Sequence, residues 1–243
     1  MHIEKNDIWI KRILIFILAI GITASFINFF HFRSLWLDEA LLAISIVNRN
    51  FSELLAPLEF DQVAPIGFLF FENLFSSLFG NQDWSLRIFP FLCFILSIGL
   101  IFKLNKQLFK SSFVALLAAC FFSLNTYVLY YSIEVKQYMS DTFICLLILT
   151  SALHYMNVKS KQSLWIYSLV ALLSVWFSNI AVIILFSVGI IGVYQVIVQD
   201  KLKSLKGFIP ISVGLLSFVS YYFLFIHNHP AKEPMTIYWT KNW

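Results

Sequence analysis

The chain has 243 residues, of which 60% are hydrophobic and only 12% are charged. Soluble domains are on average about half apolar and about a quarter charged, so a water-soluble enzyme of this size is excluded. Intrinsic disorder is also excluded, because disordered chains are poor in apolar residues. The formal net charge of +4 is less informative than the distribution of the charges. The composition predicts a polytopic membrane protein.

Seven long apolar runs divide the chain. They lack the alternation with a period of two that strands of a membrane barrel show, so each is predicted to be a helix. A spanning helix needs about 20 apolar residues; two shorter runs reach this length with the help of Lys103 and Ser163. The runs are Ile13–Phe30, Ile88–Phe102, Ser112–Tyr130, Tyr138–Met156, Leu164–Phe177, Ile180–Val198 and Phe208–Ile226. We therefore expect an all-α polytopic membrane protein with about seven transmembrane helices.

An eighth run, Pro65–Phe79, is interrupted by polar residues. Glu72, Asn73, Ser76 and Ser77 form one polar stripe at helical spacing. Pro65 suits a first helical position, and Gly80 suits the end of a helix. The pattern predicts an amphipathic helix that lies in the membrane interface and does not cross it.

The basic residues predict the topology through the positive-inside rule. If Pro65–Phe79 does not cross and the N-terminus is cytoplasmic, most of the 17 Lys and Arg residues are cytoplasmic; if it crosses, most are outside. The first arrangement is therefore favoured, with the C-terminus outside. It treats residues 1–243 as one transmembrane module with three exoplasmic segments. These are a long first loop (31–87) with juxtamembrane helices, a turn (131–141) and a tail (227–243).

Acidic residues collect in these exoplasmic segments. The first loop opens with Arg33, followed by Trp-Leu-Asp38-Glu39 at the expected start of a short helix. One interpretation is structural, because acidic residues favour a helix N-terminus. The other is an acid pair just above the membrane, where partial desolvation raises one pKa enough for base chemistry. Both remain open at this point.

Two further polar groups flank the eighth run. Asp61 and Gln62 precede it, and Arg87 precedes the next predicted span. A binding role and ordinary loop polarity explain Asp61 and Gln62 equally well. Arg87 is either an ordinary interface anchor or a contact for a lipid phosphate.

The second exoplasmic segment is unusually polar for a short hairpin. Tyr131, Glu134, Tyr138 and Asp141 have spacings that place them on one face of a helix. Lys136 points elsewhere and is available to a phosphate. An aromatic belt with solvated charges is the plain alternative. However, Asp141 is costly at membrane depth without a partner or a wet cavity, and the pattern favours function.

Other classes of site find little support in the sequence. His227 and His229 are too few to indicate a metal site. There is no Gly-rich phosphate loop. The cytoplasmic basic loops are too short and scattered for nucleic-acid binding.

Taken in order, these motifs resemble the integral-membrane glycosyltransferases of the GT-C class. The motifs are Trp-Leu-Asp38-Glu39, Gln62-x-Ala-Pro65, Ser-Leu-Arg87-x-x-Pro90 and Tyr131-Ser-x-Glu134-x-Lys136-x-Tyr138. The branch they resemble is that of protein O-mannosyltransferase and lipid A aminoarabinose transferase, in its bacterial form. The motifs cover residues 33–141, and the pattern of spans extends the resemblance to about residue 226.

The resemblance implies a hexosyl or pentosyl transferase of EC 2.4 type in a bacterial cytoplasmic membrane. It implies a polyprenyl-phosphate-linked sugar as donor, a hydroxyl acceptor on the exoplasmic face, and inversion at the anomeric carbon. Carried over, Asp38 is the catalytic base with Glu39 beside it, and Asp141 matches a second acid of the family.

The resemblance also implies residues for the donor and the acceptor. The donor phosphate would meet Lys136, Arg87 and Arg33; Lys136 stands where the family usually has arginine and lacks its bidentate fork. The expected substrate contacts are Asp61, Gln62, Tyr131, Glu134 and Tyr138. Some relatives bind a divalent metal near the position of Asp61, but no cofactor is assigned here. Membrane lipids are expected partners, and the oligomeric state is left open.

Two alternatives accompany this interpretation. Relatives usually continue beyond a seventh span, so the chain can also be an inactive fragment or a non-catalytic subunit. The second alternative is a flippase or transporter of lipid-linked sugars. Transporters place polar groups near the membrane midplane, whereas here most spans are apolar in the middle and the polar clusters lie at one surface.

Overall fold

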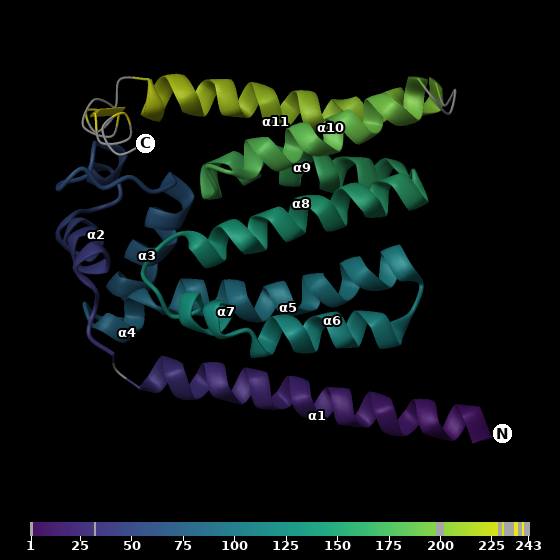
Figure 1. Cartoon of the computed structure of the whole chain (residues 1–243). Helices are drawn as coiled ribbons and strands as arrows, with labels where there is room; N and C mark the ends of the chain where they lie inside the picture. The colour runs from purple at the N-terminus through teal and green to yellow at the C-terminus, as the bar shows by residue number, and fades with distance from the viewer. Residues whose placement is uncertain are drawn as a thin grey trace.

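The computed structural model is helical and describes residues 2–31, 33–197, 202–227, 230, 236–237 and 240. The longer helices are α1 (His2–Phe30), α5 (Ile88–Phe109), α6 (Ser112–Leu124), α8 (Tyr138–Val158), α9 (Lys161–Phe177), α10 (Ala181–Ile197) and α11 (Phe208–Tyr221). They lie side by side, and successive ones run in opposite directions (Figure 1). The short helices are α2 (Leu37–Asn48), α3 (Ile66–Phe79), α4 (Asp83–Leu86) and α7 (Thr126–Tyr131). The predicted tail, 227–243, falls mostly outside the described residues.

The α2, α3 and α4 helices gather at one end of the bundle, beside α7 (Figure 1). We call residues 33–87, which contain the first three, the cap. Its core consists of apolar side chains that α2 and α3 turn toward each other, joined by Leu54, Leu86 and Val135. Val135 belongs to the segment between α7 and α8, so the core of the cap also fixes the second polar segment of the sequence.

The prediction of an all-α membrane protein is confirmed in its general form. Among the described residues, four segments are long and apolar enough to cross a membrane: Ile8–Phe30, Asp83–Phe109, Tyr138–Val158 and Leu205–Ile226. The other three predicted spans contain the shorter helices α6, α9 and α10, of 13, 17 and 17 residues. The number seven therefore stays a prediction.

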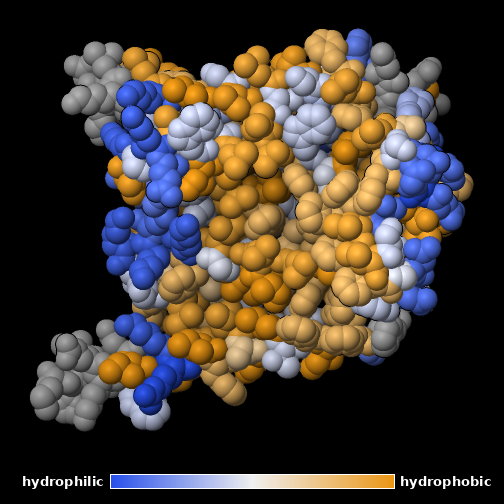
Figure 2. Space-filling view, turned by 180° about the vertical axis from the view of Figure 1, so that it is seen from behind, coloured by the Kyte–Doolittle hydropathy of each residue, from blue (hydrophilic) through white to orange (hydrophobic). Residues whose placement is uncertain are grey.

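The surface of the bundle is that of an integral membrane protein. A hydrophobic band lies between two hydrophilic ends on the face shown in Figure 2. Large apolar side chains such as Phe16, Trp165 and Leu216 are exposed along the helices. A contiguous apolar surface of this kind is stable only against lipid or another apolar partner.

The predicted run Ser112–Tyr130 is not one continuous helix. It is broken at Asn125, whose side-chain oxygen accepts hydrogen bonds from the amides of Tyr127 and Val128 at 3.0 and 3.1 Å. Asparagine commonly begins helices in this way, because its side chain competes with the helical hydrogen bonds of the backbone. Two helices, α6 and α7, therefore replace the single one that the apolar pattern predicts.

The α3 helix lies within one residue of the predicted run, with Pro65 as the residue before its first turn and not as its first helical residue. It follows Pro65 directly and ends at Gly80, whose φ of +85° suits glycine. However, the polar stripe does not face water, because Glu72, Asn73 and Ser76 are buried. Asn73 donates to the carbonyl oxygens of Ile46 and Arg49 at 2.7 and 2.9 Å. Asn73 therefore satisfies carbonyls at the C-terminal end of α2, which lack partners within that helix.

Candidate functional site

Three polar side chains from distant parts of the chain meet at the cap. The Lys136 ammonium group lies 2.9 Å from a carboxylate oxygen of Asp38 and donates to the Gln62 side-chain oxygen at 2.7 Å. The Gln62 amide nitrogen donates to the other Asp38 oxygen at 3.2 Å. We call this group the carboxylate–lysine cluster. The Lys136 side chain is 9% exposed and that of Asp38 64%, so a buried cation orients a carboxylate that solutes can reach.

Local backbone structure brings two of these side chains together. Asp38 lies in the first turn of α2, as predicted. Just before Gln62, Phe60 and Asp61 both have left-handed backbone conformations, with φ of +57° and +54°. Residues other than glycine seldom adopt this conformation. This turn leads the chain into Gln62. Asp61 itself is exposed and makes no hydrogen bond or ion pair within the described residues, so it does not join the cluster.

The charge state of Asp38 follows from its partners. Partial burial raises the pKa of this carboxyl, but the hydrogen bond and the charge of Lys136, with the Gln62 hydrogen bond, outweigh burial and lower the pKa. The pKa of Asp38 is therefore lowered and not raised. The carboxylate is ionised at neutral pH, which is the state that a general base requires.

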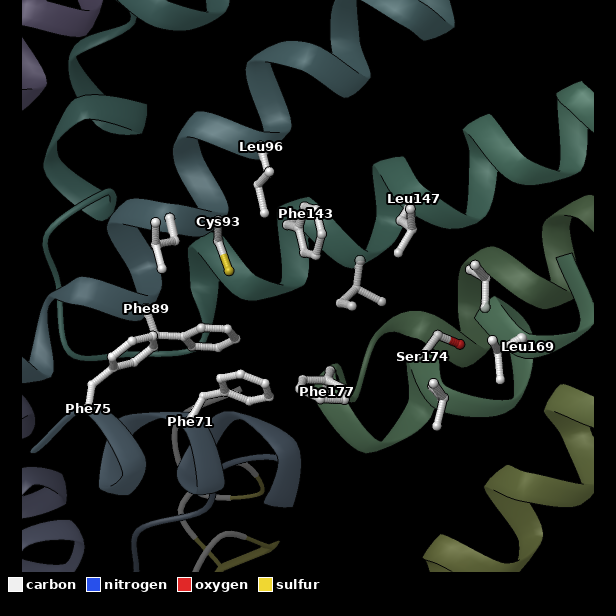
Figure 3. Close-up of a pocket in the computed structure, with 14 residues that line it drawn as sticks. Phe71, Phe75, Phe89, Cys93, Leu96, Phe143, Leu147, Leu169, Ser174 and Phe177 are labelled. Carbon is white, nitrogen blue, oxygen red and sulfur yellow. The ribbon is translucent and has the colours of Figure 1, made fainter. Parts of the chain in front are cut away.

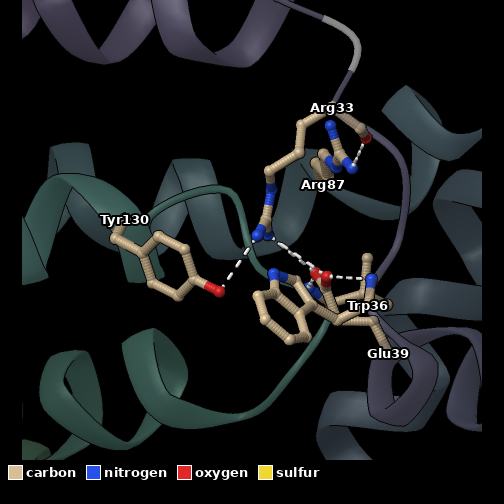
Figure 4. Close-up of polar contacts among 6 residues, drawn as sticks. Arg33, Trp36, Glu39, Arg87 and Tyr130 are labelled. Atoms are coloured by element: carbon tan, nitrogen blue, oxygen red, sulfur yellow. Dashed lines mark hydrogen bonds and ion pairs between the residues drawn. The ribbon is translucent and has the colours of Figure 1, made fainter.

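Glu39 connects the cap to the segment between α7 and α8 (Figure 4). Its side chain is fully buried. It accepts hydrogen bonds from the Arg33 guanidinium at 3.2 and 3.3 Å, and from the backbone amides of Trp36 and Val135, each at 2.8 Å. Val135 directly precedes Lys136. The contacts of Glu39 therefore hold the lysine of the cluster in place.

Two of the three arginines of the cap, Arg33 and Arg87, are also held within the protein (Figure 4). Arg33 donates to the Tyr130 hydroxyl at 3.0 Å, and its guanidinium carbon lies 4.7 Å from the centre of the tyrosine ring. Arg87 is only 1% exposed and donates to the backbone carbonyl of Arg33. Arg87 therefore anchors the start of the cap from inside.

The segment 131–141 is not the continuous helix on which its four residues would share a face. The α7 helix ends at Tyr131, and α8 begins at Tyr138. Between them, the amide of Val135 bonds to Glu39 and not to a helical carbonyl. Tyr131 and Tyr138 still meet, with ring centres 5.0 Å apart.

Asp141 is separate from the carboxylate–lysine cluster. It lies in the first turn of α8, close to the Ser178 side chain. One of its oxygens is buried and has no hydrogen-bond partner in the described part of the chain. The structure therefore does not bring Asp141 into direct contact with Asp38.

An apolar cavity of about 390 Å³ lies between α5, α8 and α9, with α3 at one end (Figure 3). Phe71, Phe89 and Phe177 gather at the α3 end, with ring centres of Phe71 5.0 and 5.7 Å from the other two. Leu96 and Leu169 line the cavity and are also exposed, so it opens on the flank of the bundle. A second hollow of about 330 Å³ borders Gln62 and reaches the end of α11.

Comparison with known families agrees with this architecture. The family model described as dolichyl-phosphate-mannose-protein mannosyltransferase matches residues 63–224, which is more than half of the chain. The chain belongs to this family. It is therefore a GT-C-type glycosyltransferase by family, and the resemblance of the motifs is confirmed. Searches of curated proteins and of solved structures found no match.

The segment that matches the dolichyl-phosphate-mannose-protein mannosyltransferase model contains only part of the candidate site. Lys136, Glu134 and Arg87 lie within the matched segment, whereas Asp38 and Gln62 precede it. The assignment of Asp38 consequently depends on the resemblance of its motif and on its contact with Lys136. The family implies a lipid-linked sugar as donor.

The side chains near Asp61 do not fit the divalent metal that some relatives bind. Across the described residues, no three His, Cys, Asp or Glu side chains lie close enough together to hold a metal ion.

Glu134 is a candidate site acid whose pKa is raised toward neutral pH. Burial raises the pKa of Glu134 from 4.5 to about 7, and the charge of Glu39 adds to the rise, while Arg33 and Lys136 oppose it. One of its oxygens is buried without a hydrogen-bond partner among the described residues. Glu134 therefore holds its proton more tightly in the folded chain than in the unfolded one.

This upward shift predicts a pH-dependent stability. Between pH 4.5 and about 7 the folded state binds more protons than the unfolded state. The contribution of Glu134 to the free energy of unfolding is therefore present in full below this pH range and is lost as the pH rises through it. After screening by water, Glu134→Gln is expected to reduce the fall in Tm between pH 5 and pH 8 by about 2–4 °C. Thermal unfolding of both proteins in nanodiscs at pH 5 and pH 8 measures this difference in Tm. The control is Glu59→Gln, which changes an exposed acid and should leave the fall in Tm unchanged. If Tm falls equally in Glu134→Gln and in the wild type, the raised pKa of Glu134 is contradicted.

Proposed function

We propose that this protein transfers a sugar from a polyprenyl-phosphate-linked donor to a hydroxyl acceptor at the exoplasmic face of a bacterial cytoplasmic membrane. The observation that carries the proposal is the carboxylate–lysine cluster at the end of an apolar bundle. It combines an accessible carboxylate with a buried cation. Base chemistry needs the first, and a departing phosphate needs the second.

The proposed topology has seven spans, with the N-terminus in the cytoplasm and the C-terminus outside. The alternating directions of the long helices support it (Figure 1). The cap and the segment between α7 and α8 lie at the same end, as this topology requires. The basic residues Lys103, Lys106 and Lys110 lie around the opposite end of α5, as the positive-inside rule requires.

The proposed reaction is a direct displacement at the anomeric carbon. The acceptor hydroxyl gives its proton to Asp38 while its oxygen forms a bond to the anomeric carbon, and the bond from that carbon to the phosphate oxygen breaks. The bonding electrons leave with the prenyl phosphate, whose growing negative charge Lys136 stabilises. Attack from the face opposite the leaving group inverts the anomeric centre.

Lys136 and Asp38 would separate during this reaction. Before the donor binds, Lys136 neutralises Asp38 and holds its pKa low. A donor phosphate that recruits the ammonium group leaves the carboxylate without its closest positive charge. The basicity of Asp38 then rises, so donor binding would prepare the base for the acceptor.

The apolar cavity supports a lipid donor. Its lining is almost entirely aliphatic and aromatic, and it opens on the flank of the bundle. A prenyl chain entering from the bilayer would lie along α5 and α9, with Phe71 and Phe177 near the α3 end. The phosphate would then be directed toward the cap.

The remaining residues have proposed roles around this reaction. Glu39, Arg33 and Arg87 act as positioning residues, because each is engaged inside the protein. Tyr131, Glu134, Tyr138, Asp61 and Asp141 stay proposed substrate contacts or acids. The charges of Lys136 and Asp38 both act on the pKa of Glu134, which links this acid to the carboxylate–lysine cluster.

Native mass spectrometry of the purified protein tests the proposed donor site. We expect a bound prenyl phosphate, or its sugar conjugate, on the wild type and on Asp38→Asn. Lys136→Ala should reduce its occupancy by about tenfold, because a hydrogen bond to a charged group is lost. Lys106→Ala, at the opposite end of α5, is the matched control and should retain the lipid. Only ordinary phospholipids on all four proteins would contradict the proposal.

A further inference from the structure

A polar hollow of about 580 Å³ lies at the cap, where the end of α2 meets the second half of α3. It is separate from the carboxylate–lysine cluster and shares no residue with it. Its lining consists mainly of amide and hydroxyl side chains, and no carboxylate lines it in the described part of the chain. These polar residues are Asn48, Asn50, Asn73, Ser76, Ser77 and Asn81.

The amides of this hollow have fixed orientations. The Asn50 oxygen accepts from the amide and hydroxyl of Ser52 and from the Glu53 amide, at 3.1, 2.6 and 3.1 Å. The Asn81 oxygen accepts from the Ser76 hydroxyl at 2.8 Å. Both amides therefore keep their NH2 groups available. Asn73 uses its NH2 group on two backbone carbonyls, which leaves its oxygen as an acceptor.

Arg49, the one cation that lines the hollow among the described residues, is already paired with a carboxylate. Arg49 lies 3.6 Å from the Glu59 carboxylate and donates to the Pro57 carbonyl at 2.9 Å. An anion would therefore find no unpaired positive charge. Phe51 adds an aromatic face; it is 41% exposed and is held by stacking on Phe70, with ring centres 4.5 Å apart.

We propose that this hollow binds a neutral oligosaccharide. Sugar hydroxyl groups need both donors and acceptors, which the oriented amides supply, and the apolar face of a sugar ring can pack against Phe51. A peptide strand fits less well, because strand recognition relies on pockets for alternate side chains. The hollow offers mainly polar groups instead.

The position of the hollow indicates which sugar-bearing molecule it serves. The α2 helix carries Asp38 in its first turn and ends at Asn48, on the edge of the hollow. At 1.5 Å per residue these points are about 15 Å apart along the helix. On the proposed function, the acceptor is then a short glycan whose far end binds in the hollow while its reacting hydroxyl reaches Asp38.

Saturation-transfer NMR on the full chain in nanodiscs, without donor and without sugar detergents, tests the hollow. The probes are maltotriose and mannotriose, with a serine-containing peptide as the competing class of ligand. We expect a trisaccharide to bind the wild type. The double variant Phe51→Ala/Asn81→Ala should bind it about tenfold more weakly, since a hydrogen bond and an aromatic contact are lost.

The control variant changes a phenylalanine and a side-chain amide outside the hollow. Phe109→Ala/Gln82→Ala alters an exposed Phe at the other end of α5 and an exposed amide next to Asn81, and should bind as the wild type does. No binding of either trisaccharide, equal losses in both double variants, or binding of the peptide alone would overturn the proposal. Asp38→Asn should keep trisaccharide binding, so a failure of the transfer reaction would be distinguished from a failure of the hollow.

Discussion

Replacing Asp38 by asparagine is expected to lower the rate of sugar transfer by about 100- to 10,000-fold, the usual contribution of a general base. The substitution keeps the shape of the side chain but removes the charge that accepts the proton. Because the substitution leaves Lys136, whose side chain is only 9% exposed, without its charged partner, it should also cost about 1–3 kcal/mol of stability, between the values for an exposed and a buried ion pair. Release of prenyl phosphate from a labelled donor, under single-turnover conditions, measures the rate.

The matched control for this measurement is Glu59→Gln, which neutralises another exposed acid of the cap. Its ion pair with Arg49, at 3.6 Å, lies outside the carboxylate–lysine cluster, so the rate should stay near that of the wild type. Asp38→Asn should also retain bound prenyl phosphate, since Lys136 is unchanged. A rate within a factor of about three of the wild type would show that Asp38 is not the base.

Local features of the sequence predicted much of this architecture. Apolar runs gave the positions of the long helices, since the need to satisfy the backbone within lipid leaves few alternatives. The α3 boundaries followed from Pro65 and Gly80, because these residues have backbone preferences that act locally. The start of α2 at Asp38 was accessible for the same reason.

Contacts between distant residues were not accessible in this way. Lys136 and Gln62 are separated by 74 positions, and nothing in either local pattern indicates that they share Asp38. The polar stripe of α3 illustrates the same limit. Its spacing predicts the helix, but only the packing of α2 shows that Asn73 satisfies buried carbonyls and does not face water.

The segment 131–141 shows how a tertiary contact can override a local pattern. Its spacing favours a continuous helix, yet the amide of Val135 bonds to Glu39, 96 positions away. A buried carboxylate gains more from a short bond to a backbone amide than the segment gains from one additional helical turn. The apolar cavity was missed for a related reason, because α3, α5, α8 and α9 each contribute only a few of its residues.

Replacing Glu39 by glutamine is expected to destabilise the protein by about 3 kcal/mol, because it leaves the largely buried Arg33 without its ion-pair partner. The Arg33 side chain is 24% exposed, whereas that of Glu39 is fully buried. The segment before Lys136 should loosen as well, since the Val135 amide loses a charged acceptor at 2.8 Å. Unfolding in nanodiscs measures the loss of stability, and prenyl-phosphate occupancy measures the loss at the donor site.

A double-mutant cycle distinguishes this positioning role from direct catalysis. Arg33→Leu removes the other member of the pair, and combining it with Glu39→Gln avoids a buried charge without a partner. The double variant should therefore be more stable than the sum of the single losses implies, with a coupling energy of about 1–3 kcal/mol. If Glu39 only positions Lys136, transfer activity should recover together with stability and donor occupancy. Stability that recovers without activity would assign Glu39 to the chemical step itself.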